Sequence, residues 1–147
     1  MTFTFRPARD TDAEWLFTLR RATMRDYVEQ MFGPWDDDTQ RRRFQQAGEL
    51  NNIRIIVVGR REVGLLHVER ERFAVFLANI HILPEYQNRG LGTTVIRSVQ
   101  AGGQAAELPV RLQVLKVNRK ARRLYERLGF VLRGETDTHF RMIWQPA

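Results

Sequence analysis

The residues best suited to chemistry in this sequence form a glycine-containing run, Gln87-Asn88-Arg89-Gly90-Leu91-Gly92-Thr93. It follows a strand-like stretch, Phe76 to Leu83, and opens a helix-like one, Thr93 to Val99. Glycines let a backbone come close to a ligand, and the first amides of a helix lack intrahelical acceptors and lie at its positive end. This combination is typical of a phosphate or pyrophosphate site. The run has neither the Walker A lysine nor the length of the dinucleotide fingerprint, so an ordinary glycine turn is the alternative.

A second segment, Asn118 to Phe130, follows another strand-like stretch, Val110 to Val117. Its residue types predict a helix with Asn118 as N-cap and Gly129 just past the C-terminal end. Asn118 and Tyr125 are seven residues apart, about two helical turns, so they share one face. A capped amphipathic helix with a core tyrosine is the alternative interpretation.

Together, and in this order, the two segments resemble the GCN5-related N-acetyltransferase (GNAT) family, in particular its small bacterial single-domain members. The first matches as Gln87-x-x-Gly90-x-Gly92, and the second as Asn118-x-x-Ala121-x-x-Leu124-Tyr125-x-x-x-Gly129-Phe130. In that family the loop holds the pyrophosphate of acetyl-CoA, and the later block closes the other side of this co-substrate. The resemblance implies acetyl transfer from acetyl-CoA to a primary amine of a small molecule or peptide.

The resemblance also implies roles for individual residues. The backbone N–H near Ile80 would face the acetyl carbonyl, and Ile82 would meet the pantetheine arm through its backbone. Tyr125 would protonate the departing thiolate or stabilise it by a hydrogen bond. Asn118 would hydrogen-bond the pantetheine arm or order a water. The expected co-substrate-binding set is Ile80, Ile82, Gln87, Asn88, Arg89, Gly90, Leu91, Gly92, Thr93 and Asn118.

The general base is less well defined. Many family members have a glutamate on the strand before the loop, and Phe76 occupies that place here. His81 titrates in the useful range, although strand alternation puts it on the side opposite Ile80 and Ile82. His139, on the last predicted hairpin, is a second candidate, as are the carboxylates of Glu29, Asp36 and Asp38. A chain of waters, or an amine that arrives already neutral, is an equal alternative.

The segment from Tyr27 to Asp38 mixes aromatic side chains with carboxylates, which suits a cationic amine. We therefore expect Tyr27, Glu29, Trp35 and Asp36 to bind the acceptor. The alternative is a buried Trp35 followed by an acidic helix N-terminus.

The composition fits one domain spanning residues 1–147, without disulfides, since the chain has no cysteine. Direct transfer in a ternary complex is expected, because a cysteine intermediate is impossible. No metal is expected. The N-terminus has no apolar run of signal-peptide type and no stretch reaches membrane-spanning length, so we expect a cytoplasmic protein without membrane association.

The net charge of +7 is carried mostly by arginine and would suit a polyanionic partner. The arginines are scattered and no nucleic-acid-binding motif is present, which disfavours a nucleic-acid role. An acyl-CoA-binding module without catalysis is the other alternative. Exposed sheet edges would permit a homodimer.

Hydrophobic periodicity predicts alternating elements and hence an α/β fold. Helices are expected from Asp10 through Leu19, over about Asp38–Leu50, after the glycine run and from Asn118. Strands are expected at Phe3–Arg6, Ile53–Val58, Glu62–Glu69, Arg72–Leu83, Val110–Val117, Phe130–Gly134 and Thr138–Trp144. The resemblance implies a mixed, mostly antiparallel sheet flanked by helices and splayed between its fourth and fifth strands.

Overall fold

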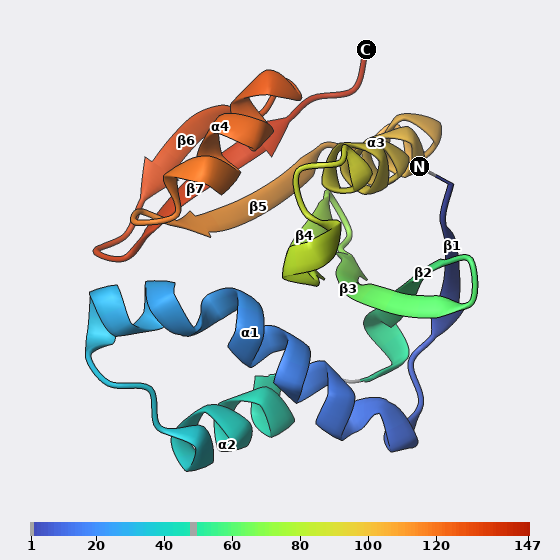
Figure 1. The fold of residues 1–147 in the computed structure, drawn as a ribbon. Helices are drawn as coiled ribbons and strands as arrows, with labels where there is room; N and C mark the ends of the chain where they lie inside the picture. The colour runs from blue at the N-terminus through green and yellow to red at the C-terminus, as the bar shows by residue number, and fades with distance from the viewer. Residues whose placement is uncertain (1, 48–49) are drawn as a thin grey trace. The chain divides into compact units, whose positions relative to one another are not determined.

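The computed structural model describes residues 2–47 and 50–147 (Figure 1). Its strands are β1 (Thr4–Pro7), β2 (Ile53–Val58), β3 (Arg61–Arg70), β4 (Val75–Ile82), β5 (Val110–Leu115), β6 (Val131–Glu135) and β7 (His139–Trp144). Its helices are α1 (Ala13–Phe32), α2 (Asp37–Ala47), α3 (Leu91–Ala106) and α4 (Arg119–Arg127). Short 3-10 turns occupy Asp10–Asp12, Leu50–Asn52 and Pro84–Tyr86.

The strands form one seven-stranded mixed sheet in the order β1-β2-β3-β4-β5-β7-β6. The pairs β1–β2, β2–β3, β5–β7 and β6–β7 are antiparallel, and β4–β5 is parallel. The parallel ladder joins residues 75–77 to 110–112, after which β4 continues to Ile82 and β5 to Leu115. The expected α/β class with a mixed sheet is confirmed. The divergence of β4 and β5 that the resemblance implies stays a prediction.

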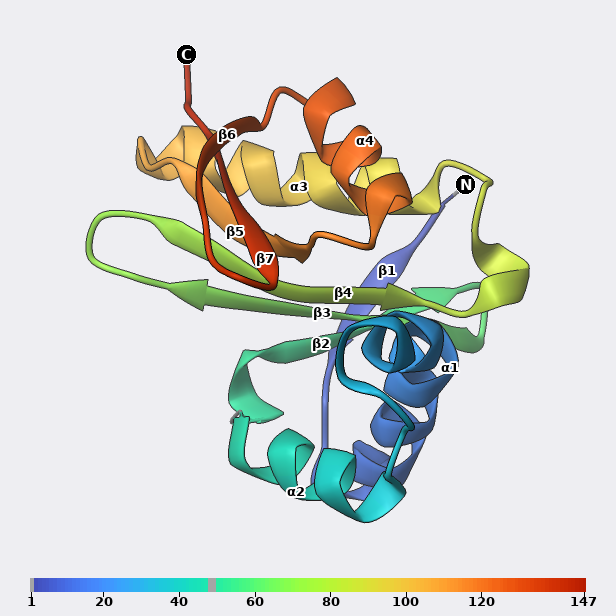
Figure 2. The same cartoon turned by 90° about the vertical axis from the view of Figure 1, so that its left-hand side faces the viewer.

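The chain divides into two compact units, and the first comprises residues 1–67 and 79–89. Figures 1 and 2 show α1 and α2 lying beside each other in this unit. Leu16 and Leu19 of α1 pack with Ile53, Ile55 and Leu65 in a buried cluster. These positions recur at helical spacing on α1 and on one face of each strand, so both periodicities supply the same core.

The second unit comprises residues 68–78 and 90–147. Gly103 of α3 is buried, and a Cβ there would lie 2.9 Å from the backbone oxygen of Leu108, so only glycine allows this close approach. The side chain of Gln100 donates to the backbone oxygen of Leu128 at 2.7 Å, which ties α3 to the end of α4. The expectation of a single domain over residues 1–147 stays a prediction.

Several predicted boundaries need correction. The strand expected from Arg72 begins at Val75, because residues 71–74 form a turn closed by the Glu71 N–H to Ala74 oxygen bond of 2.9 Å. The helix after the glycine run begins within it, at Leu91, and extends to Ala106. The helix expected to reach Leu50 ends at Ala47, and residues 48–49 lie outside the described residues. No helix in the described ranges is both long and apolar enough to span a bilayer.

Candidate functional site

The first part of the glycine run lies in the first unit and is held by its own side chains. The amide nitrogen of Gln87 donates to the backbone oxygen of Ile82 at 2.8 Å, so the loop is fastened to the end of β4. Asn88 has a positive φ of 62°, which an asparagine tolerates better than most residues. Arg89 is exposed, with its guanidinium 5.5 Å from the ring centroid of Tyr86. The loop is therefore ordered and its arginine faces solvent, where a phosphate could reach it.

The second part of the run lies in the second unit and forms the start of α3. Gly90 is the N-cap, with φ 82° and ψ 0°, and no side chain caps the helix within the described residues. A Cβ on Gly90 would meet no described atom within 4 Å, so the side of the turn where it would project is open. Leu91 is buried and anchors the first turn, whereas Gly92 and Thr93 are half-buried. Their amides are among the first of the helix, where no intrahelical acceptor exists, and could bind an anion.

The second predicted segment forms α4 in the same unit as Gly90. The Asn118 side chain accepts a hydrogen bond from the Ala121 N–H at 3.2 Å, which confirms the predicted N-cap. This bond uses Oδ1, and the amide nitrogen of Asn118 plays no part in the cap. Gly129 has a φ of 92°, as expected after a helix.

Tyr125 is buried on α4, with its ring 5.7 Å from that of Phe130 in an edge-on arrangement. Burial raises the pKa of its hydroxyl to about 12. The hydroxyl therefore stays protonated at neutral pH and can donate a hydrogen bond. Ile80 and Ile82 lie on β4 in the first unit, half-buried and buried respectively.

The two histidine candidates lie in different units. His139 begins β7, and its Nδ1 is 2.7 Å from the hydroxyl of Thr138; burial lowers its pKa. His81 on β4 is 6% exposed, and its Nδ1 is 3.0 Å from the hydroxyl of Thr23 on α1. Burial, and secondarily the charge of Arg20, lowers the pKa of His81 to about 3. His81 is therefore neutral, but it is a much weaker base than an exposed histidine.

The expected acceptor-binding residues already have structural partners. The Glu29 carboxylate accepts the backbone N–H of Trp35 at 3.0 Å, and the Trp35 indole donates to Asp37 at 2.6 Å. Asp36 accepts from both the backbone N–H and the hydroxyl of Thr39, and so caps α2. Hydrogen bonds from Thr39 are the main reason that the pKa of Asp36 is lowered. Tyr27 is half-buried on α1, so the segment forms a braced α1–α2 connection whose carboxylates remain near the surface.

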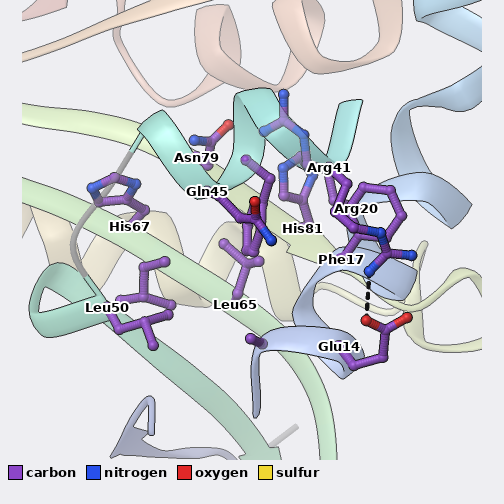
Figure 3. A pocket seen from close by; sticks show the side chains of 13 residues that line it. Glu14, Phe17, Arg20, Arg41, Gln45, Leu50, Leu65, His67, Asn79 and His81 are labelled. Atoms are coloured by element: carbon purple, nitrogen blue, oxygen red, sulfur yellow. Dashed lines mark hydrogen bonds and ion pairs between the residues drawn. The ribbon is translucent and has the colours of Figure 1, made fainter. Parts of the chain in front are cut away.

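The first unit also contains a pocket of about 250 Å³ that the sequence does not predict (Figure 3). It is lined by α1, α2, the turn after α2 and the faces of β2, β3 and β4. Its polar lining is Glu14, Arg20, Arg41, Gln45, His67, Asn79 and His81, and its apolar lining is Ala13, Phe17, Phe44, Leu50, Ile53 and Leu65. Two signals could have indicated it. Arg20 falls on the apolar face of α1 four residues after Leu16, and Asn79 and His81 alternate along β4.

Within the described residues, no group of three or more histidine, cysteine, aspartate or glutamate side chains could hold a metal ion. Each unit thus carries candidate functional features of its own. The first unit holds the pocket beside β4 and the loop up to Arg89, and the second holds the uncapped α3 N-terminus and the face of α4 that carries Asn118 and Tyr125.

Comparisons with known proteins identify the family and the fold of this chain. The profile described as "Acetyltransferase (GNAT) family" matches residues 20–130. A search of curated protein sequences finds no significant match. Among solved structures, an N-acetyltransferase of Thermoplasma acidophilum in complex with coenzyme A superposes with a TM-score of 0.82 at 16% identity, over 99% of both chains.

Two further solved structures share the fold. An acetyltransferase of Thermus thermophilus superposes with a TM-score of 0.78 at 18% identity, over 99% of this chain and 97% of its own. The ribosomal-protein-S18-alanine N-acetyltransferase of Escherichia coli gives 0.72 at 18% identity, over 99% and 95%. At such identities the structures establish a shared fold, and the profile match establishes the family. The chain belongs to the GNAT acetyltransferase family and is an acyltransferase.

Proposed function

We propose that this protein transfers an acetyl group from acetyl-CoA to a primary amine by direct attack in a ternary complex. Family membership supplies the reaction class and the thioester donor. The observation that carries the assignment to this chain is the start of α3, where Gly90 adopts a left-handed conformation and leaves the first amides uncapped. Such a terminus suits the pyrophosphate of coenzyme A.

The residues present fit this ligand. Gln87 to Thr93 would hold the pyrophosphate through backbone amides, and the exposed Arg89 would reach a phosphate. Ile80 and Ile82 would contribute backbone groups to the acetyl and pantetheine portions. Asn118 would donate from the amide nitrogen that its capping bond leaves out. Each of these assignments is a proposal about this chain.

The chemistry requires a neutral amine, whose lone pair attacks the acetyl carbon. The new C–N bond forms, the C–S bond breaks, the amine loses a proton and the coenzyme A thiolate gains one. The Ile80 N–H would stabilise the negative charge that develops on the carbonyl oxygen.

Tyr125 would assist the leaving thiolate by donating a hydrogen bond. With its pKa at about 12 and a thiol near 8.5, complete proton transfer is uphill by roughly 5 kcal/mol. A hydrogen bond to the thiolate, completed by protonation from solvent, is therefore the favoured role.

Calorimetric titration with acetyl-CoA, alongside dephospho-CoA and ATP, tests the proposal, followed by free-thiol release with a panel of amines. Micromolar binding of acetyl-CoA with amine-dependent thiol release is the expected result. Binding without turnover would favour a module that only holds acyl-CoA. No binding, together with salt-dependent binding to random-sequence DNA, would favour the nucleic-acid alternative.

The remaining expectations from the sequence have separate tests. Cell fractionation would test the cytoplasmic location, and sedimentation would test the possible homodimer.

A further inference from the structure

The pocket beside β4 contains two buried polar atoms that have no hydrogen-bond partner among the described residues: Nε of Arg20 and Nε2 of His81. Unpaired buried polar atoms are costly, and native structures that contain them often have a ligand or water there. Both residues line the same pocket (Figure 3). The two atoms are themselves buried, so they mark Arg20 and His81 as the lining residues with unmet hydrogen-bonding capacity.

The hydrogen bonds of Thr23 favour the tautomer of His81 that carries its proton on Nδ1. A threonine hydroxyl has a single proton, and Thr23 donates it to the backbone oxygen of Arg20 at 3.2 Å. With its proton on the Arg20 oxygen, the hydroxyl accepts from Nδ1–H of His81, 3.0 Å away. In this neutral tautomer Nε2 is an acceptor, so the pocket presents a cationic donor, Arg20, beside a neutral acceptor, His81.

Among the described residues, the charges around the pocket leave Arg20 without a counter-ion. Glu14 forms an ion pair with Arg41, whose guanidinium also lies 4.2 Å from the ring centroid of Phe17. No carboxylate pairs with Arg20 in the part of the chain that the structure describes. Burial, and secondarily the charge of Arg43, lowers the pKa of Arg20, which again indicates a cation short of a counter-ion.

We infer that the acetyl acceptor is an amine that also carries a carboxylate, with the carboxylate bound by Arg20 in this pocket. A guanidinium matches the two oxygens of a carboxylate, and the positive charge of Arg20, unpaired among the described residues, matches one negative charge. Phe17, Phe44 and Leu65 in the lining suit an apolar side chain, so an amino acid with an apolar side chain fits best. This inference rests on the proposed function.

The position of the pocket along β4 supports an acceptor rather than a remote effector. Asn79 and His81 line the pocket and flank Ile80 in the sequence, the residue whose backbone N–H is proposed to face the acetyl group. Neighbouring residues in a strand are only about 3.3 Å apart along its axis. A molecule in the pocket would thus lie close to Ile80, and its amine could donate to Nε2 of His81 before it attacks.

The test compares L-phenylalanine with L-phenylalaninamide, and L-leucine with L-leucinamide, as acceptors in the thiol-release assay. Each pair has the same side chain and differs in the carboxylate. Because the carboxamides have less basic α-amines, KM is compared as the concentration of neutral amine. We expect a KM about 10- to 100-fold lower for the acids, the range for a charge-assisted hydrogen bond. Arg20→Gln should remove this preference by raising KM for the acids, with a smaller effect on kcat. Arg60→Gln, an exposed charge change on the β2–β3 turn, should retain it.

Acetyl-CoA titration of the same proteins distinguishes a failure of the carboxylate site from a failure of the proposed function. If acetyl-CoA binds and the carboxamides react as well as the acids, the carboxylate site is refuted and the proposed function stands. A preference for O-phosphoethanolamine over every amino acid would also refute it. If Arg20→Gln does not fold, the wild-type comparison decides, together with the rise in Tm that phenylalanine, but not its amide, should produce without acetyl-CoA.

Discussion

Replacing His81 by glutamine should flatten the dependence of stability on pH. The pKa of His81 is lowered to about 3 in the folded protein, against about 6.5 in an unfolded chain. The folded state therefore holds His81 neutral, whereas the unfolded state binds a proton as the pH falls below 6.5. The stability that neutral His81 contributes is present above pH 6.5 and is lost progressively as the pH falls towards 3.

The size of the loss follows from these two values. At pH 5 an unfolded histidine is mostly protonated, which lowers the free energy of unfolding by about 2 kcal/mol relative to pH 7.5. By pH 3 the loss reaches about 4 kcal/mol, but carboxylates with lowered pKa values, such as Asp12 and Glu71, then contribute as well. Between pH 5 and 7.5 few carboxylates change their protonation, so the pH dependence of stability there reports mainly on histidine.

Urea denaturation of the wild type and His81→Gln at several pH values in this window measures the effect. The free energy of unfolding of the wild type should fall by about 2 kcal/mol more than that of the variant between pH 7.5 and 5. His139→Gln, at a less deeply buried histidine, is the matched control and should retain most of the dependence. Parallel curves for wild type and His81→Gln would refute the burial argument, as would an NMR titration of His81 with a midpoint near 6.5.

Three further predictions concern the co-substrate and acceptor sites. Tyr125→Phe should lower kcat by about 10- to 100-fold with little change in the Kd for acetyl-CoA, and unchanged turnover would remove this hydroxyl from the chemistry. Gly90→Ala should cost about 1 kcal/mol of stability because its φ is +82°, and should weaken acetyl-CoA binding in calorimetry. The matched change Gly102→Ala, at an exposed position inside α3, should instead stabilise by about 0.5–1 kcal/mol, and a similar effect of both changes would contradict the turn argument. Asp36→Asn should preserve the α2 cap, since asparagine caps equally well, but should raise the acceptor KM if its charge attracts the amine; equal kinetics would leave Asp36 as a cap alone.

Local patterns made most of the fold predictable. Asn118 and Gly129 mark the ends of α4 because capping depends on residues close in sequence, and both adopt the expected geometry. The sequence pattern predicts the start of α3 too late in the chain, at Thr93. Gly90 already serves as the N-cap and the helix begins with the buried Leu91, which depends on packing that the sequence pattern does not reveal.

Local sequence patterns do not predict the pocket beside β4, because its residues come from elements distant in the sequence. Arg20 on α1 and His81 on β4 are 61 positions apart, and the hydroxyl of Thr23 bonds to both only in the folded chain. His81 shows what a sequence pattern cannot predict. The sequence identifies it as a candidate base, but only its burial shows how strongly its basicity is suppressed.

That suppression bears on how the acceptor amine loses its proton. The low pKa of His81 has two causes, burial first and the charge of Arg20 second, and a carboxylate bound to Arg20 would cancel the second. The acceptor would thereby raise the basicity of His81 as it binds, although burial alone would still keep the pKa below 6.5. His81 then serves better as a hydrogen-bond acceptor that orients the amine than as the base that removes its proton. On this argument kcat/KM should follow the ionisation of the free amine, so it should rise with pH up to the pKa of the acceptor. A plateau beginning near pH 6.5 that disappears in His81→Gln would instead make His81 the base.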